Sequence, residues 1–337
     1  MRSFPEPSPV SEKASEQAIE KATEQAAEPD ADTVLASKGR SFHWARRLLG
    51  KEHAVRATRL YRFCRYIDDV VDEEASVEQA IIMLHEVQES ILTAHSRHEI
   101  LIDGLRLMDE CHISKAVVLD LIDGVGSDMD VVRIEDEDAL LRYCYQVAGT
   151  IGLMMCKVLD SQDEAATPFA IDLGIAMQLT NICRDIKTDA CIDRRYIPTN
   201  WVHESEPAGL ISPNVAQQVW IRSAVARLLD CAETYYQSGE RGLSYLPFRA
   251  RVSILVAARV YREIGRQLKK KNYTYWESRM IVSTPRKCLV TLQALFDVMR
   301  DPKFWQTPKQ HDSNLHRALQ NIQPFNTRST TRNVSAS

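Results

Sequence analysis

Apolar residues recur at three- and four-residue spacing along most of the chain between about residues 34 and 300. This spacing places them on one face of an α-helix, and no segment shows the alternation typical of a half-buried strand. Gly50, Pro198 and the pair Ser212-Pro213 fall between the periodic segments, where helices are expected to end. The predicted helical segments are 34–49, 52–73, 77–95, 98–110, 114–128, 137–160, 166–189, 214–239, 250–271 and 285–299. The pattern predicts an all-α fold, built as one domain of about ten helices.

Both ends of the chain lack this pattern. Glu recurs every four residues through 12–28, which stacks like charges on one helix face and provides no large apolar face. We therefore predict a disordered acidic tail over residues 1–32. The chain from 306 to 337 is polar, rich in Gln, Asn, Ser and Thr, and is also predicted to be disordered. The helical domain is then expected to span residues 33–305.

The charge distribution and the cysteine content argue against several classes of function. The formal net charge is −4, and residues 1–30 hold seven acids against three bases, also −4, so that residues 31–337 sum to zero. No general basic field predicts nucleic-acid binding. The eight cysteines form no CxxC pair, which favours reduced thiols in a cytosolic protein and argues against a zinc site. No apolar run approaches the roughly 20 residues that cross a bilayer, so any membrane contact is expected to be peripheral.

Nucleotide-binding and zinc-protease motifs are also missing. The nine histidines show no HExxH-type spacing, and neither GxGxxG nor GxxxxGK[ST] occurs. A nucleotide-dependent enzyme is therefore disfavoured.

Two stripes of polar residues stand out within otherwise apolar helices. In the first, Tyr61, Arg65, Asp68 and Asp72 follow steps of four, three and four, which places them on one helix face. The second stripe follows steps of three, four and four on a later helix. It consists of Gln178, Asn181, Asp185 and Asp189, with Arg184 beside it.

Facing carboxylate lines are suited to hard cations. Mg²⁺ prefers oxygen ligands, retains several waters, and is commonly shared between one or two carboxylates and the phosphates of a substrate. The alternative for either stripe is an ordinary solvated helix face. Two stripes, each flanked by apolar residues and each carrying an arginine, favour a site that binds metal ions and a diphosphate.

Two further features of the sequence each have a functional and a purely structural explanation. Arg40 and Ser41 precede a helix and could hold phosphate at its N-terminus, or Ser41 could be a simple N-cap. Gly149 and Gly152 lie within a predicted helix interior, where Gly costs about 1 kcal/mol against Ala. They indicate either an apolar tunnel or close helix–helix contact, and physical reasoning slightly favours the contact.

Four blocks of the sequence resemble the successive signature blocks of the squalene/phytoene synthase family, most closely those of bacterial phytoene synthases. They read RSFHWARRLL (40–49), LYRFCRYIDDVVDE (60–73), YCYQVAGTIGLMM (143–155) and AMQLTNICRDIKTDACIDRRYIP (176–198). The similarity covers about residues 34–300 in the order and spacing of the family.

The resemblance implies an all-α isoprenoid-synthase fold, a helical bundle around a central cavity. It also implies Mg²⁺-dependent head-to-head condensation of two geranylgeranyl diphosphates, with Mn²⁺ as a substitute ion. The product would be phytoene, formed through a cyclopropyl diphosphate (prephytoene diphosphate) with release of diphosphate. This is the first committed step of carotenoid biosynthesis, and no NADPH is expected.

The resemblance also assigns roles to residues. The implied metal ligands are Asp68, Asp72, Asn181, Asp185 and Asp189. The implied diphosphate-binding residues are Arg40, Ser41, Arg65, Arg184, Tyr261 and Arg279. The implied catalytic residues are Tyr61 and Tyr143, near the reacting carbons, together with Asp68, Asp72, Asp185 and Asp189.

The resemblance leaves two rival functions. The nearer is squalene or dehydrosqualene synthesis from farnesyl diphosphate, and the more remote is a non-catalytic assembly protein of the same fold. The expected surroundings are the cytoplasm, with peripheral contact at the inner face of the membrane and with other carotenoid-pathway enzymes.

Overall fold

The computed structural model describes residues 40–72, 76–161, 163–203, 205–308, 310–320 and 322. Within these ranges the regular secondary structure is helical, and the only extended pairing is an isolated bridge between Arg133 and Arg195. The all-α prediction is therefore confirmed.

The helices lie close to the predicted segments. Their bounds are α3 (Arg40–Arg46), α4 (Lys51–Asp72), α5 (Val77–Thr93), α6 (Glu99–Glu110), α7 (Lys115–Gly126), α8 (Glu137–Cys144), α9 (Thr150–Val158), α10 (Thr167–Cys191), α11 (Pro207–Ile211), α12 (Val215–Arg241), α13 (Phe248–Lys270) and α14 (Thr284–Arg300). Short 3₁₀ turns connect several of them, among them η1 (Ser127–Met129), and another, η7 (Ser313–Leu319), follows α14.

Side-chain caps explain why several helices begin where they do. Ser76 accepts a hydrogen bond from the backbone of Gln79 at the start of α5, and Asp136 caps α8 in the same way. Asn214 and Gln217 form a reciprocal capping box at the start of α12. These side chains satisfy backbone N–H groups that a helix N-terminus leaves unpaired.

Two details differ from the sequence prediction. The segment predicted as one helix over 137–160 is divided by a π-helical turn at Tyr145–Gly149, which separates α8 from α9. Such turns occur often beside functional sites. The five-residue helix α11 falls in a segment where periodicity predicted none.

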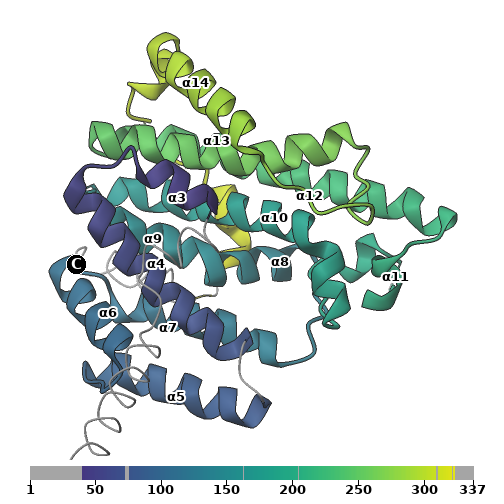
Figure 1. Ribbon diagram of the computed structural model, residues 1–337, viewed down its shortest axis with the longest axis horizontal. Coiled ribbons are helices and arrows are strands. Elements are labelled where there is room, and N and C mark those ends of the chain that lie inside the picture. Colours follow the sequence, from purple (N-terminus) through teal and green to yellow (C-terminus); the bar gives the residue numbers. More distant parts are fainter. Residues whose placement is uncertain are drawn as a thin grey trace, which may run out of the picture.

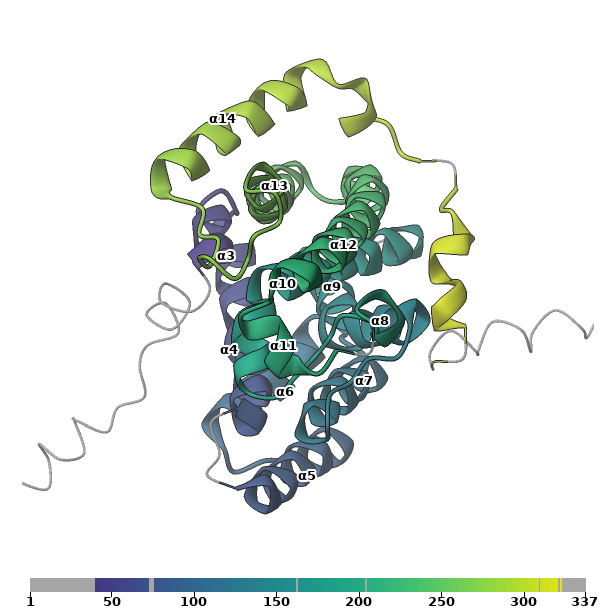
Figure 2. The ribbon, with the colours of Figure 1, turned by 90° about the vertical axis from the view of Figure 1, so that its right-hand side faces the viewer.

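Helix α10 is the centre of the bundle. It packs against α12, α9, α13, α11 and α8, and Figures 1 and 2 show it enclosed by neighbouring helices. Helix α14 lies across α13 at one edge of the molecule, and α5 lies at the opposite edge (Figure 2).

The apolar core consists of two clusters that meet at one place. The first surrounds α8, α10 and α12. The second gathers around α4, α6, α7, α9 and α13. Val147, Met177 and Ile254 pack against both clusters and also line a cavity. The cavity therefore lies where the two halves of the core join.

Glycines allow α9 and its preceding π turn to approach α10 closely. A Cβ on Gly152 would lie 2.2 Å from the carbonyl oxygen of Ala170, and one on Gly174 would lie 2.3 Å from that of Ala148. Gly152 and Gly174 also line the cavity. Of the two explanations considered for Gly152, close helix contact is confirmed, and the same contact borders the cavity.

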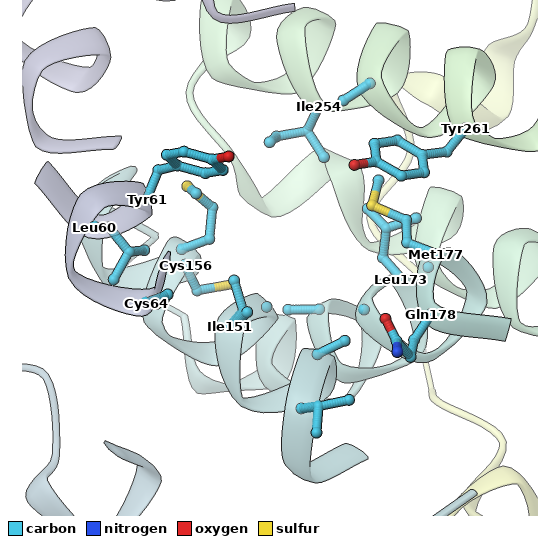
Figure 3. A pocket seen from close by; sticks show the side chains of 18 of the residues that line it. Leu60, Tyr61, Cys64, Ile151, Cys156, Leu173, Met177, Gln178, Ile254 and Tyr261 are labelled. Atoms are coloured by element: carbon cyan, nitrogen blue, oxygen red, sulfur yellow. The ribbon is translucent and has the colours of Figure 1, made fainter. Parts of the chain in front are cut away.

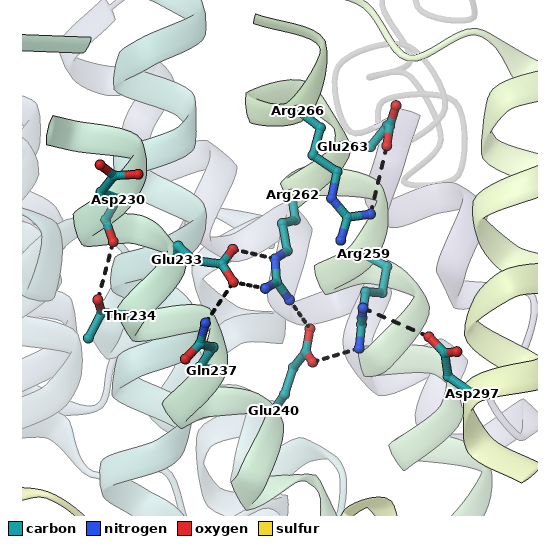
Figure 4. Close-up of polar contacts among 10 residues, drawn as sticks. All are labelled: Asp230, Glu233, Thr234, Gln237, Glu240, Arg259, Arg262, Glu263, Arg266 and Asp297. Carbon is teal, nitrogen blue, oxygen red and sulfur yellow. Dashed lines mark hydrogen bonds and ion pairs between the residues drawn. The ribbon is translucent and has the colours of Figure 1, made fainter. Parts of the chain in front are cut away.

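Ion pairs link α12, α13 and α14 (Figure 4). Arg262 binds both Glu233 and Glu240, with 3.0 Å between its Nη1 and Glu240 Oε1. Arg259 also binds Glu240, at 2.9 Å, and reaches Asp297 of α14 at 3.9 Å. Because Glu240 is shared by two guanidinium groups, the chain of contacts holds the three helices in register.

The end of the described chain corrects one prediction. Residues 310–320 were expected to belong to a disordered tail from residue 306. Instead, η7 packs against α8, with Ala318 and Leu319 buried in the first core cluster. Tyr235 donates a hydrogen bond to the carbonyl of Leu315 at 2.7 Å. The predicted acidic tail over 1–32 and most of the remaining polar tail lie outside the described residues.

The structure bears on two further predictions, which concern the cysteines and the membrane. All eight cysteines are free thiols, as their spacing predicted. Among the described residues, no helix combines the length and apolar character needed to cross a membrane.

We expect Gly174→Ala to lower the free energy of unfolding by about 1–3 kcal/mol, because the added methyl would meet the backbone of Ala148 and force the helices apart. Urea unfolding followed by circular dichroism measures this change. Gly50→Ala is the matched control, since nothing lies within 4 Å of a Cβ there. Equal stabilities for the two variants would contradict the close contact between α10 and the π-helical turn before α9.

Candidate active site

A cavity of about 460 Å³ opens between α4, α9, α10 and α13. Its volume is within the range of small-molecule sites, about 300–1,000 Å³. Most of its walls are apolar. Apart from the thiols of Cys64 and Cys156, the ionisable and amide side chains that line it are Tyr61, Arg65, Asp68, Asp128, Tyr143, Gln178, Asn181, Arg184 and Tyr261.

The character of the walls changes along two of the lining helices, α10 and α4. Along α10 the lining passes from Phe169 and Leu173 to Asn181 and Arg184. Along α4 it passes from apolar Leu60 to charged side chains one and two turns later. Figure 3 shows the apolar part of the cavity, with the hydroxyl groups of Tyr61 and Tyr261 directed toward each other across it.

The first predicted stripe divides between the cavity and its rim. Arg65 and Asp68 line the cavity and form an ion pair of 3.1 Å, and Arg65 also contacts Asp69. Asp72, at the last position of α4, lies outside the lining and is 43% exposed. It binds Arg194 at 3.1 Å.

The second stripe shows the same division. Asn181 and Arg184 line the cavity, whereas Asp185 and Asp189 lie beyond them on α10. Asp185 accepts hydrogen bonds from Arg184 at 3.0 Å and from Arg279 Nε at 2.8 Å. The side-chain oxygen of Asn181 is buried and accepts no hydrogen bond from the described residues. A buried acceptor without a donor is unusual and points to a ligand.

Asp128 in η1 lies between the two stripes and was missed by the sequence analysis. It lines the cavity and accepts hydrogen bonds from Tyr143 and Tyr196, each at 2.9 Å. The rings of these tyrosines stack at 4.8 Å. Arg194 donates to the backbone carbonyl of Asp128 as well as to Asp72.

Signals for these additional residues were present in the sequence. Arg194 and Tyr196 lie in the RRYIP segment of the last family-like block, beyond the predicted aspartates. Asp128 belongs to the polar segment SDMD at 127–130. Nothing in the spacing of Asp128 relates it to either stripe, because its position depends on contacts with Tyr143 and Tyr196, which are distant in the sequence.

The carboxylates at this end of the cavity repel one another. Desolvation, reinforced by Asp72, Asp69 and Asp128, raises the pKa of Asp68 to about 6, although Arg65 opposes the shift. Desolvation and the charge of Asp185 likewise raise the pKa of Asp189 to about 7. Asp128 also has a raised pKa, with burial as the main cause. Both stripes end at helix C-termini, whose dipoles disfavour negative charge and favour cations.

Asp185 behaves differently because arginines surround it. Burial disfavours its charge, but the hydrogen bonds and charges of Arg184 and Arg279 lower its pKa below the usual value. Burial raises the pKa of Tyr61 to about 12 and that of Tyr143 well above its ordinary range. Both tyrosines are therefore neutral phenols at neutral pH.

The predicted site residues whose side chains the structure describes thus occupy one region. Tyr261 lines the cavity from α13, and Arg279 reaches Asp185 from the segment after α13. The side chains of Arg40 and Ser41 lie outside the described part of the structure, so that their predicted phosphate contact stays a prediction. The assembled groups offer oxygen ligands for cations, guanidinium donors for a polyanion, and an apolar volume for a long chain.

The fold is shared with solved structures. It matches a dehydrosqualene synthase solved in complex with ligand, at a TM-score of 0.70 and 24% identity over 80% of this chain and 95% of that one. It also matches a squalene synthase from Alicyclobacillus acidocaldarius, at a TM-score of 0.60 and 17% identity over 79% and 97% of the two chains. At these identities the likeness concerns the fold alone.

The sequence identifies the family. The squalene/phytoene synthase model matches residues 35–287, and the chain belongs to that family. A phytoene synthase of Pseudescherichia vulneris is 35% identical over 83% of this chain and 94% of its own length. A 15-cis-phytoene synthase of Pantoea ananas is 33% identical over 82% and 96%. The family uses prenyl diphosphates and is typically metal-dependent.

We expect Asp189→Asn to stabilise the metal-free protein at pH 8, with the gain shrinking toward pH 5. The native pKa of Asp189 is raised from 3.8 to about 7, so the native state binds more protons than the unfolded state between these values. The wild type therefore loses stability as the pH rises through this window, whereas the variant does not.

Urea unfolding in EDTA at pH 5 and pH 8 measures the difference. Asp109→Asn, at an exposed position on α6, is the control and should follow the wild type. If Asp189→Asn also followed the wild type at both pH values, Asp189 would have an ordinary pKa.

Proposed function

We propose that this chain is a phytoene synthase, which condenses two geranylgeranyl diphosphates head to head and commits them to carotenoid biosynthesis. The observation that carries this proposal is the 33–35% identity to phytoene synthases over more than 80% of the chain. The cavity supports it, because charged groups at one end and apolar walls elsewhere suit a substrate with a diphosphate head and a long hydrocarbon tail.

Five oxygen-bearing side chains are proposed to hold Mg²⁺, with Mn²⁺ as a substitute: Asp68, Asp72, Asn181, Asp185 and Asp189. Three observations support this fit. The buried oxygen of Asn181 has no donor among the described residues. The pKa values of Asp68 and Asp189 are raised by desolvation and by neighbouring carboxylates, which a cation would relieve. The ligand set consists of oxygens, which this ion prefers.

The arginines are proposed to hold the diphosphate. Arg65 and Arg184 line the cavity, and Arg279 lies beside Asp185 at its rim. Each is paired with a carboxylate. When the carboxylates bind cations, these guanidinium groups can turn toward phosphate oxygens, for which their planar fork is well suited. Tyr261, together with Arg40 and Ser41, completes the proposed set.

Catalysis then rests on charge and on exclusion of water. Bound Mg²⁺ would neutralise the diphosphate and make it a better leaving group. The apolar walls keep water away from the allylic cation and from the cyclopropylcarbinyl cation of the later step. Tyr61 and Tyr143 offer ring faces to these cations, an effect of about 1–2 kcal/mol each.

Tyr143 is also placed to handle a proton. It donates its hydroxyl hydrogen to Asp128 Oδ2 at 2.9 Å, which leaves its own oxygen as an acceptor at the cavity wall. Tyr196 donates to the other oxygen of Asp128 and stacks on Tyr143, which fixes the ring. We assign Asp128 and Tyr196 to positioning Tyr143 for the proton losses that close the cyclopropane and form the product.

The surroundings of the protein follow from its proposed substrates. Geranylgeranyl diphosphate and phytoene carry long hydrocarbon chains, so we propose a cytoplasmic enzyme with peripheral contact at the inner face of the membrane and with other carotenoid enzymes. The outer face of α14 supports such a contact. It exposes Leu292, Phe296 and Met299, at 64%, 50% and 82%.

Two rival functions need a direct test. A squalene or dehydrosqualene synthase would use farnesyl diphosphate, and the solved structures with this fold include such enzymes. A non-catalytic assembly protein would not need both carboxylate stripes, and both are intact.

Purified protein incubated with Mg²⁺ and either geranylgeranyl or farnesyl diphosphate, with and without NADPH, separates these functions. We expect phytoene from geranylgeranyl diphosphate, without any requirement for NADPH, as measured by extraction and chromatography of the hydrocarbon. Consumption of farnesyl diphosphate alone would show that the phytoene assignment is wrong. No turnover of either substrate would favour the assembly protein.

We expect Asp72→Ala and Asp185→Ala each to reduce turnover at least about 100-fold, because each removes a proposed metal ligand from the charged end of the cavity. The helical circular-dichroism signal should survive, since neither side chain belongs to the core. Asp109→Ala on α6 is the control and should keep wild-type activity. Near-wild-type turnover in either site variant would rule out its metal-binding role.

A further inference from the structure

A second polar cluster lies outside the cavity, on another face of α10. Asp172 is fully buried, although its neighbours Phe169 and Leu173 line the cavity. Two histidines from the segment after α14 converge on it. His311 Nε2 lies 2.8 Å from Asp172 Oδ2, and His316 Nε2 lies 2.7 Å from Asp172 Oδ1. Residues 139 and 144 positions away in the sequence thus meet at one carboxylate.

These three side chains form a set of metal ligands. Their ligand atoms all lie within 4.8 Å of one another. Two imidazoles and one carboxylate are a donor set that zinc accepts in tetrahedral sites. With zinc–ligand bonds of about 2.0–2.2 Å, two ligands of one ion lie about 3.3 Å apart. The observed nitrogen–oxygen distances are shorter by roughly half an ångström, so that small side-chain rotations would admit the ion.

The surroundings hold the ligands in place. Ser238 of α12 hydrogen-bonds to Asp172. The ring of Phe169 meets that of His311 edge-on at 5.1 Å, and the two imidazoles lie 4.6 Å apart. The side chains of His311 and His316 are 11% and 10% exposed, so the cluster lies just beneath the surface.

Charge favours a cation at this place. With both imidazoles neutral, the cluster carries one negative charge at a carboxylate that is completely withdrawn from solvent. Hydrogen bonds from His311, His316 and Ser238 stabilise this buried charge but do not neutralise it. The hydrogen bonds leave the cluster with its negative charge, whereas a divalent cation would neutralise it.

We propose that Asp172, His311 and His316 form a zinc site that fastens the segment 310–320 to α10. The cysteine and histidine spacings argued against zinc in the sequence. That prediction did not consider this cluster, because its three ligands show no local spacing. The site would be structural and separate from the proposed Mg²⁺ ligands, and its test does not depend on the prenyl diphosphate reaction.

The test uses the full-length protein, stripped with EDTA and titrated with ZnCl₂ against a chromophoric chelator in excess Mg²⁺. We expect the wild type to bind one equivalent of Zn²⁺ tightly, and His316→Ala to lose it. His95→Ala, at an exposed histidine just after the end of α5, and Asp185→Ala should both retain it. Equal zinc uptake by the wild type and His316→Ala would overturn the proposal. The three side chains would then be held together by hydrogen bonds only.

His311→Gln keeps the test decisive if the alanine variant does not fold. Its amide can still donate a hydrogen bond to Asp172 but is a poor zinc ligand. We expect His311→Gln to fold without taking up zinc, and Zn²⁺ to raise the unfolding midpoint of the wild type only. Co²⁺ in place of Zn²⁺ should give visible absorption bands of a tetrahedral site. A Zn²⁺-induced rise in the midpoint of His311→Gln as large as that of the wild type would contradict the site.

Ser238→Ala tests the hydrogen bond that supports the carboxylate of Asp172. Because Ser238 supports the carboxylate without being a ligand, its loss should weaken Zn²⁺ affinity about 10- to 100-fold while one equivalent still binds. An unchanged Zn²⁺ affinity would show that the hydrogen bond from Ser238 does not position Asp172 for metal binding.

Discussion

Carboxylates gathered around a poorly hydrated space are the constraint on which the rest of this structure depends. Asp68, Asp128 and Asp189 all have raised pKa values, because desolvation and mutual repulsion disfavour their charges. Arginines relieve part of this repulsion, as Arg184 and Arg279 do for Asp185. The remaining deficit of positive charge makes the region receptive to cations and, through them, to a diphosphate.

Such a site needs a rigid frame, since repelling groups would otherwise move apart. Helix α10 supplies much of it. Close contacts through Gly152 and Gly174 lock it against the segment around α9, and α12 and α13 cover it on other sides. The two core clusters then meet around the cavity through Val147, Met177 and Ile254. The same helix contributes apolar wall, amide and guanidinium groups to the cavity, and Asp172 to the opposite side.

The apolar and charged parts of the cavity divide the chemistry between them. Charge at one end can hold and activate a leaving diphosphate, and apolar walls can shield carbocations from water. Tyr143 stands at the boundary, with Asp128 and Tyr196 fixing its hydroxyl. The π-helical turn at Tyr145–Gly149 begins two residues later. It places the break between α8 and α9 beside a residue whose orientation matters for the proposed reaction.

The sequence by itself determined the all-α fold, most helix bounds and the two polar stripes, because helical periodicity and capping depend on residues only a few positions apart. It could not determine that Asp68 faces the cavity while Asp72 binds Arg194 at the rim, or that Asp128 joins the stripes. Nor could it place His311 and His316 on Asp172. These arrangements depend on contacts between segments distant in the chain, which no local spacing encodes, and on a burial that only the packed bundle creates.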